Sequence, residues 1–315
     1  MNHQLAVILR SICITLGVVS LCSVALLTYK SNLVSAEGDV LAANDLDLSL
    51  RLRSLERPRL SLPSQLTEND AKRLRSFGSK KLKKIFRPIF TLEERRQVMN
   101  ALEVLTNALD NAGIDYFLYG GSLIGSLRHH DIIPWDDDID IIVNISNWQK
   151  LENLSFPGHT LNIQTLNRYK FYSNAAKKIP SYFWSWPYID VCFFGDNGTH
   201  LFDMDPNFSR TFLYDKKLVY PLTWRPFGDL MLKSPRDSAA IVDQTYDIEE
   251  CQSRSYNHKR QKSMPKSNVT TIDCRVLHGV YPFVRQSSKN RTHIENLYIE
   301  DRLLHTYDSQ LLTYV

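Results

Sequence analysis

Cysteine is scarce in this sequence, with five residues among 315. No two of them stand in a Cys-x-x-Cys spacing, and no Cys/His spacing typical of a zinc site is present, so a structural zinc site is not expected. Internal repeats are also absent. With 43% apolar and 23% charged residues, the composition argues against wholesale disorder and against a fibrous architecture. One folded domain with an extension is the simplest organisation for this length.

Charge is missing from one long stretch near the N-terminus. From Ser11 to Tyr29, nineteen residues carry no charge, and a basic residue flanks them on each side. Such a run is long enough to cross a bilayer as a helix, so we predict an N-terminal transmembrane anchor over residues 1–30. The alternative is a signal peptide cut after Val34-Ser35-Ala36, although the run exceeds the usual signal core of about 7 to 15 residues. The anchor predicts a single-pass type II protein of the Golgi or ER membrane, and the signal peptide predicts secretion.

Basic residues are concentrated in one segment. Between Arg51 and Phe90 there are twelve Lys or Arg and three acids. A nucleic-acid-binding fold would carry its positive charge on the domain itself, so no nucleic-acid partner is expected. We interpret residues 31–90 as a solvated basic stem. The alternative is that this segment contacts an acidic partner or a lipid surface.

Glycosylation motifs and cysteines fit a secretory protein. Six Asn-x-Ser/Thr motifs begin at Asn144, Asn153, Asn197, Asn207, Asn268 and Asn290. Cys192 lies inside an apolar run and is expected to be a buried thiol. Cys251 and Cys274 lie in polar sequence, where a disulfide and two free thiols remain equal alternatives.

The folded domain is predicted to span residues 91–315 and to begin with a helix. Thr91 and Glu94 have the spacing of a capping box, and the apolar residues that follow share one helical face up to Gly113. The other predicted elements are strands at 115–119, 138–143, 160–166, 188–194 and 227–232, helices at 122–128, 236–246 and 291–312, and a loop at 253–266. This order indicates an α/β or α+β domain with a small mixed sheet flanked by helices.

Four aspartates fall within five positions, at 136, 137, 138 and 140, in otherwise apolar sequence. Burying them is costly unless a cation offsets their repulsion, and oxygen ligands suit Mg²⁺ or Mn²⁺. Because side chains alternate along a strand, Asp138 and Asp140 are predicted to face one spot and to bind the metal. Asp190, a single acid in an apolar run, is the candidate for a third ligand or a general base. Its alternative is a cap at the end of a strand.

A glycine turn precedes the aspartates. Gly120-Gly121-Ser122 stands between a predicted strand and a predicted helix, where backbone N–H groups can bind a phosphate. Gly121 and Ser122 are therefore candidate phosphate-binding residues. Arg128, at the end of the same helix, can hold a phosphate through its guanidinium or can face the solvent.

The segment from Tyr119 to Ile141, which reads YGGSLIGSLRHHDIIPWDDDIDI, closely resembles the signature of the LicD family of fukutin-like phosphotransferases. A weaker similarity extends to Asp247, where Thr245-Tyr246-Asp247 lacks the glycine of the family's Tyr-Gly-Asp. The resemblance implies the nucleotidyltransferase fold. It also implies transfer of a phosphoalcohol, such as phosphocholine or ribitol phosphate, from a CDP-linked donor to a sugar hydroxyl of a glycan or glycoprotein.

Carried over by position, the resemblance implies that Asp138 and Asp140 bind the metal, that Asp190 is the third carboxylate, and that Gly121 and Ser122 touch the donor phosphate. The acceptor hydroxyl would be deprotonated by Asp190 or by a neighbouring carboxylate such as Asp136, and CMP would leave.

Two other functions stay open at this stage. One is a catalytically silent relative that binds a glycan or a glycosyltransferase, and the other is a cytosolic enzyme that uses ATP, which conflicts with the apolar N-terminus. The aromatic residues Tyr182, Phe183, Trp184 and Trp186 are interpreted mainly as packing residues. Their alternative is stacking on cytosine or enclosure of a quaternary ammonium group.

Overall fold

The computed structural model describes residues 80–163, 167–289 and 292–308. They belong to one of the two compact units of the chain, Arg57–Val315. The predicted anchor and most of the predicted stem lie outside the described residues. Among the helices that are described, none combines the length and the apolar character that crossing a bilayer requires.

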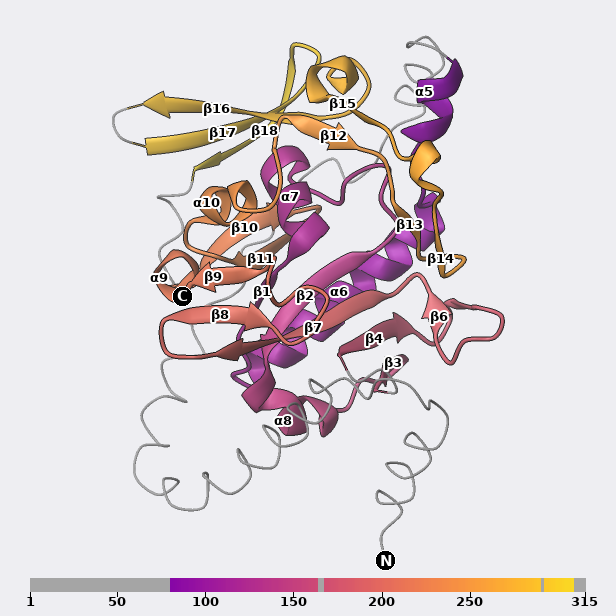
Figure 1. The fold of residues 1–315 in the computed structure, drawn as a ribbon, viewed down its shortest axis with the longest axis vertical. Coiled ribbons are helices and arrows are strands. Elements are labelled where there is room, and N and C mark those ends of the chain that lie inside the picture. The colour runs from indigo at the N-terminus through magenta and orange to yellow at the C-terminus, as the bar shows by residue number, and fades with distance from the viewer. Residues whose placement is uncertain (1–79, 164–166, 290–291, 309–315) are drawn as a thin grey trace, which may run out of the picture. The chain divides into compact units, whose positions relative to one another are not determined.

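The domain contains the predicted long helix, α6 (Leu92–Asn111), directly after Thr91. The capping box is formed, because Thr91 Oγ1 accepts from the Glu94 N–H while the Glu94 carboxylate accepts from the Thr91 N–H. Gly113 follows the helix with φ +61°, a left-handed conformation that glycine adopts without strain. The buried face of α6 packs on β4 and β7 of the main sheet (Figure 1).

The described end of the predicted stem packs on the domain. Helix α5 (Lys80–Ile85) leads to Phe86, which is buried and meets the Trp135 ring edge-on at 5.2 Å between centroids. Phe90 stacks on Trp186 at 5.3 Å.

Seven strands form the main sheet, in the order β1-β2-β7-β4-β3, and β8 and β9 extend it from β7. Strands β2 and β7 run parallel, and the other neighbours are antiparallel. The strands are β1 (Tyr116–Leu118), β2 (Ile139–Asn144), β3 (His159–Asn162), β4 (Arg168–Ser173), β7 (Ile189–Asp196), β8 (His200–Asp203) and β9 (Leu213–Asp215). The predicted mixed α/β domain is confirmed, as are the strands predicted around β1, β2 and β7.

Shorter elements surround this sheet. The helices are α7 (Gly120–His129), α8 (Trp148–Glu152), α9 (Lys216–Val219) and α10 (Ser238–Asp243), with 3₁₀ turns η3 (Ile145–Asn147), η4 (Lys266–Asn268) and η5 (Cys274–Leu277). The antiparallel pairs are β5 (Lys177–Lys178) with β6 (Ser185–Trp186), β10 (Thr223–Phe227) with β11 (Leu230–Ser234), β12 (Glu250–Gln252) with β15 (Thr271–Asp273), and β13 (Tyr256–Asn257) with β14 (Lys262–Ser263). The predicted loop at 253–266 therefore contains a small hairpin.

The predicted closing helix at 291–312 is wrong. The described residues there form strands of a three-stranded antiparallel sheet, β16 (Phe283–Lys289), β17 (Thr292–Ile299) and β18 (Arg302–Asp308). Along β17 the buried positions are Glu295, Leu297 and Ile299, which is the two-residue period of a strand. An acid on the buried face hides this period in the sequence. Glu295 is tolerated there because Arg225 donates to both of its carboxylate oxygens, at 3.0 and 2.7 Å.

The cysteines of the domain are partly paired. Cys251 and Cys274 form a disulfide that joins β12 to the residue after β15, with their Cα atoms 4.9 Å apart. Cys192, in β7, is the expected buried free thiol.

Candidate active site

Two glycines let helix α7 approach the acidic strand closely. Gly120 has φ +52°, and a Cβ atom added there would lie 3.6 Å from Asp140 Oδ2. A Cβ atom at Gly121 would lie 3.1 Å from Asp136 Oδ2. The first turn of α7 therefore borders the acidic residues with backbone rather than with side chains.

Ser122 ties the same helix to strand β2. Its Oγ accepts a hydrogen bond of 2.8 Å from the backbone N–H of Asp140, and Ser122 is buried. Of the two candidate phosphate-binding residues, Gly121 lines the site cavity, whereas Ser122 is not among the described residues that line it. The structure thus gives Ser122 a positioning contact to Asp140.

Three carboxylates converge between β2 and β7. Asp140 and Asp190 are register partners in the parallel pair, and Asp138 precedes Asp140 by two residues. One oxygen from each of Asp138, Asp140 and Asp190 lies within 4.8 Å of the others. The three residues predicted to bind a metal are therefore brought together.

The chemistry of this group fits a hard divalent cation. Within the described residues no donor reaches the buried Asp140 Oδ1, and the Nη1 atom of Arg168 lies 4.0 Å from it. Burial, followed by the charge of Asp190, raises the pKa of Asp140 to about 7. Burial also raises the pKa of Asp138, with the neighbouring Asp140 adding to it. Anionic oxygens that repel one another in this way are the ligands that Mg²⁺ and Mn²⁺ prefer.

Lys170 partners the third carboxylate. It lies in β4, opposite Asp190 in the antiparallel register, and its Nζ donates to Asp190 Oδ1. Both side chains are almost fully buried. Lys170 therefore holds one oxygen of Asp190 and offsets part of the negative charge.

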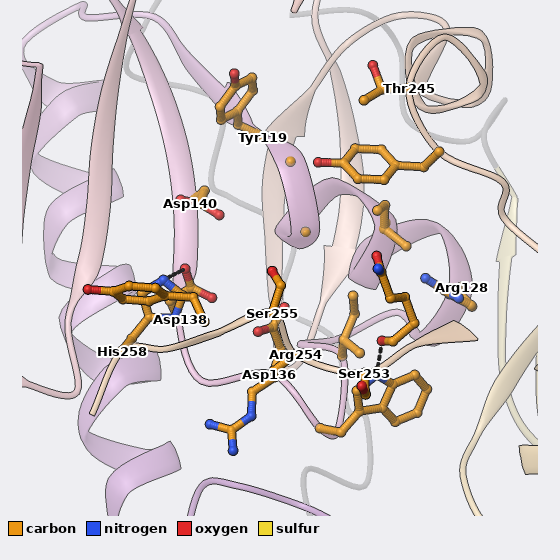
Figure 2. Close-up of a pocket in the computed structure, with 18 of the residues that line it drawn as sticks. Tyr119, Arg128, Asp136, Asp138, Asp140, Thr245, Ser253, Arg254, Ser255 and His258 are labelled. Carbon is orange, nitrogen blue, oxygen red and sulfur yellow. Dashed lines mark hydrogen bonds and ion pairs between the residues drawn. The ribbon is translucent and has the colours of Figure 1, made fainter. Parts of the chain in front are cut away.

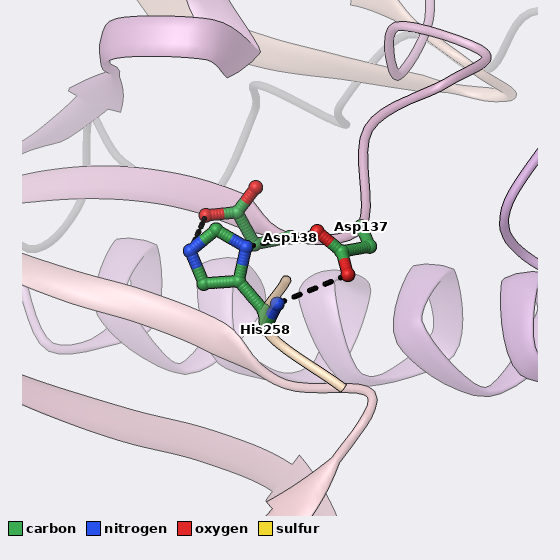
Figure 3. Close-up of side chains that lie close together, drawn as sticks. All are labelled: Asp137, Asp138 and His258. Carbon is green, nitrogen blue, oxygen red and sulfur yellow. Dashed lines mark hydrogen bonds and ion pairs between the residues drawn. The ribbon is translucent and has the colours of Figure 1, made fainter. Parts of the chain in front are cut away.

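Asp136 and Asp137 lie in different surroundings from each other. Asp136 lines the site cavity, and burial raises its pKa. Asp137 is fully buried and forms hydrogen bonds with the segment around His258, as Figure 3 shows. The ring of His258 bridges Asp137 and Asp138, with Nδ1 2.9 Å from Asp137 Oδ1 and Nε2 3.0 Å from Asp138 Oδ2. Although burial lowers it, these two acids raise the pKa of His258 to about 10.

A cavity of about 500 Å³ opens beside the carboxylates. Its walls come from the start of α7, the aspartate segment, residues 245–247 and residues 252–258. Figure 2 shows Asp138, Asp140 and His258 on one side of this cavity and Arg128 on another. Asp190 is buried and is not among the described residues that line the cavity.

Arg128 lines the cavity but does not face open solvent. It is 7% exposed, and its Nη1 donates to the Glu250 carbonyl and lies 3.0–3.1 Å from both sulfurs of the disulfide. Its Nε is buried, and no acceptor among the described residues reaches it. Burial lowers the pKa of Arg128 to about 10. The solvent-facing alternative is therefore wrong, while contact with a substrate phosphate stays a proposal.

Arg168 is a site residue that the sequence reading missed. Its guanidinium lies in the cavity 3.7–4.0 Å from carboxylate oxygens of Asp140, Asp203 and Asp205, and 4.5 Å from the centre of the Phe208 ring. Arg168 and Lys170 share one face of β4, a strand the sequence analysis did not predict. The alternation of polar and aromatic residues in 168–173 was the available signal.

The aromatic cluster at 182–186 is mainly packing. Trp186 is 2% exposed and donates through Nε1 to the Asp137 carbonyl, and Tyr182 and Trp184 pack beside it. Phe183 is 71% exposed. The aromatic residues that do line the cavity are Tyr119, Trp135, Phe208, Phe212, Tyr246 and Tyr256. Stacking on a donor base by the 182–186 cluster is therefore not supported.

Comparison with known proteins agrees with this geometry. Residues 113–237, which include α7 and the three carboxylates, match the model of the nucleotidyltransferase domain of LicD, FKTN and FKRP. Residues 113–237 are thus similar to the LicD family. The matched range includes the paired strands β2 and β7 together with Asp138, and the expected resemblance is confirmed.

Three known proteins are similar to parts of the chain. The chain is 36% identical to human ribitol 5-phosphate transferase FKRP over 74 residues. This match covers 21% of the chain and 15% of FKRP. Over 67 residues, or 21% of the chain, it is 39% identical to the lipopolysaccharide cholinephosphotransferase LicD of Haemophilus influenzae, of which 25% is covered. Over 146 residues, or 44% of the chain, it is 28% identical to the uncharacterized protein RT0683 of Rickettsia typhi, of which 41% is covered. The matches thus span a quarter or less of the two named transferases.

Proposed function

We propose that this protein is a divalent-metal-dependent transferase that moves a phosphoalcohol group from a CDP-linked donor to a sugar hydroxyl of a glycan or glycoprotein. The observation that carries the proposal is the convergence of Asp138, Asp140 and Asp190 beside the glycine turn of α7, at the edge of a cavity. The similarity to a ribitol 5-phosphate transferase and a cholinephosphotransferase supports the same class of reaction.

In this proposal Asp138, Asp140 and Asp190 hold Mg²⁺ or Mn²⁺, which would supply positive charge to the phosphate oxygens. The backbone of Gly121 and the guanidinium of Arg168 bind the donor diphosphate, because both border the cavity beside the carboxylates. Arg128, which lines another side of the cavity (Figure 2), adds positive charge there.

Asp136 is the better candidate for the general base. It lines the cavity, and its raised pKa makes it a stronger proton acceptor than an ordinary aspartate. Asp190 is buried, is not among the described residues that line the cavity and is engaged by Lys170, which favours a role as ligand over a role as base. The acceptor hydroxyl gives its proton to Asp136 and attacks the phosphorus bonded to the alcohol, and CMP leaves.

The proposed setting is the lumen of the Golgi or ER, with residues 1–30 as the anchor of a single-pass type II membrane protein. This setting agrees with the Cys251–Cys274 disulfide, because such bonds persist in oxidising compartments.

Release of CMP from CDP-ribitol, CDP-choline and CDP-glycerol, measured with Mn²⁺ or Mg²⁺ and with a chelator, tests the function. We expect metal-dependent release from at least one donor and its loss in Asp140→Asn, with Asp301→Asn as the exposed control. Equal release by the wild type and Asp140→Asn would refute the site. No release from any of the three donors would count against the proposed donor class.

A further inference from the structure

Asp137 does not share the surroundings of the other three aspartates of its segment. It is 0% exposed and does not line the cavity, although residues 135, 136 and 138 do. The group of converging oxygens around Asp140 and Asp190 contains Asp138 and not Asp137. A role for Asp137 must therefore be sought in its own contacts.

The contacts of the Asp137 carboxylate all reach one distant segment, Ser253–Lys259. Asp137 Oδ2 accepts from Arg254 Nη1 at 2.7 Å, from the His258 N–H at 3.0 Å and from the Lys259 N–H at 3.4 Å. Asp137 Oδ1 faces His258 Nδ1 at 2.9 Å. One buried carboxylate thus receives two side chains and two backbone donors, and Figure 3 shows its contact with the His258 backbone. Charge-assisted hydrogen bonds of this kind are the stronger ones in proteins.

The anchored segment forms a wall of the cavity. Ser253, Arg254, Ser255, Tyr256 and His258 all line it. Arg254 is turned to Asp137, so its charge is already engaged. The wall then offers the exposed Ser255 hydroxyl and the half-buried Tyr256 ring. A hydroxyl and an aromatic ring suit a neutral sugar better than a phosphate.

His258 also connects this wall to the carboxylate site. While Nδ1 faces Asp137, Nε2 lies 3.0 Å from Asp138 Oδ2. The distance between the wall and the carboxylates is therefore fixed by two adjacent aspartates through one imidazole ring.

We propose that Asp137 is a positioning residue that holds the Ser253–Lys259 segment against strand β2, where the segment forms the wall that receives the sugar acceptor. The acceptor part rests on the proposed function, whereas the anchoring part rests on the contacts of Asp137 alone.

Hydrogen–deuterium exchange of the full chain tests the anchoring. Asp137→Asn keeps the size of the side chain but points an amide N–H₂ group at donors, so exchange across Ser253–Lys259 should become about tenfold faster or more. Exchange in α6 should stay as in the wild type, and Asp301→Asn, at a fully exposed position, should change neither region. Unchanged exchange across Ser253–Lys259 in a folded Asp137→Asn protein would overturn the proposal.

Arg254→Gln provides the second variant if Asp137→Asn does not fold. It removes one donor from the partly exposed side of the contact and leaves the other donors in place. Faster exchange in the same segment supports the anchoring, and no change refutes it.

Addition of Mn²⁺ with CMP separates positioning from general stabilisation. In the wild type, these two probes should slow exchange across Ser253–Lys259, and the response should be lost in Asp137→Asn but kept in Asp301→Asn. An equal response in Asp137→Asn and the wild type would overturn the positioning role. If the probes leave exchange unchanged throughout the wild type, including Gly120–Asp140, the proposed function fails. The comparison of the proteins without the probes still decides whether Asp137 anchors the segment.

Discussion

Asp140 and Asp190 are direct register partners across the parallel strands β2 and β7. This placement brings two carboxylates together in the interior, where burial and mutual repulsion raise the pKa of Asp140 to about 7. Between about pH 4 and pH 7 the folded protein therefore holds a proton at Asp140 that the unfolded chain, with an ordinary pKa of 3.8, would release. Without a cation, stability should fall as the pH rises from about 4 through about 7.

Substitution Asp140→Asn should remove this loss. In the presence of a chelator, we expect Asp140→Asn to have a higher Tm than the wild type at pH 8 and a smaller difference at pH 5. Each unit of pKa shift corresponds to roughly 1.4 kcal/mol of unfolding free energy. Thermal unfolding at the two pH values measures the effect. Identical pH dependence in the two proteins would contradict it.

The glycine turn allows a matched comparison of strain and crowding. Gly120→Ala forces a left-handed conformation and should cost about 1–2 kcal/mol of unfolding free energy. Gly121→Ala has no such strain but crowds Asp136, so it should lower CMP release with little change in stability. Gly113→Ala, which has a similar φ and open space around it, is the control that should lose stability without a specific loss of activity.

Arg168 should matter for donor binding through its planar guanidinium. Arg168→Ala should raise the KM for the donor by about 10-fold to 100-fold. Arg168→Lys should raise the KM less, because a lysine keeps the charge but cannot form the paired contacts of a guanidinium. Initial rates of CMP release at varied donor concentration give the values. Arg210→Ala, at an exposed position, serves as the control, and a normal donor KM in Arg168→Ala would argue against the contact.

The buried pair of Arg225 and Glu295 should stabilise the three-stranded sheet. Although burial opposes ionisation, Arg225 and His130 lower the pKa of Glu295 to about 2. A lowered pKa contributes stability that is present above the ordinary value of 4.5 and is lost as the pH falls through about 2. Glu295→Gln should cost about 3–5 kcal/mol at pH 7 and show a smaller further loss at pH 3. Denaturant unfolding at pH 7 and pH 3 measures these free energies. If the pair were unimportant, the wild type and Glu295→Gln would lose the same free energy of unfolding between the two pH values.

The Cys251–Cys274 disulfide should stabilise the part of the domain that contacts Arg128. Closing a loop with a sequence separation of 23 is worth about 3 kcal/mol in the chain-entropy picture. The double substitution Cys251→Ser with Cys274→Ser should lower the Tm, and a reductant should then have no further effect. A reductant that still lowered the Tm of the double variant would point to another cause.

The sequence was most informative where the signal is local. The capping box of Thr91 and Glu94 is contained in four residues, and the strand that begins directly after Asp138 and holds Asp140 is a short apolar run. The alternation of side chains was enough to place these two carboxylates on one face. Asp190 was a candidate because it is a single acid in an apolar run, and its position beside Asp140 follows from the pairing of β2 with β7.

The parts that could not be predicted depend on contacts between distant segments. Lys170 lies between two aromatic residues and His258 lies in a polar and basic run, and their roles appear only when β4 and the 253–259 segment meet the aspartates. The strand β17 was predicted as a helix because Glu295 occupies its buried face. Arg225, seventy positions away, and His130, whose Nε2 lies 3.0 Å from the same carboxylate, make that burial tolerable.

The parallel pairing of β2 with β7 also bears on the order in which the chain folds. Parallel neighbours cannot be joined by a tight hairpin, so β3 to β6 are inserted between them, and Asp190 meets Asp140 only after this crossover is in place. Such long-range pairs form slowly because the connecting chain must be ordered first. The two carboxylates thus repel each other only once this long-range pair has formed, and not while β2 and β7 are still apart.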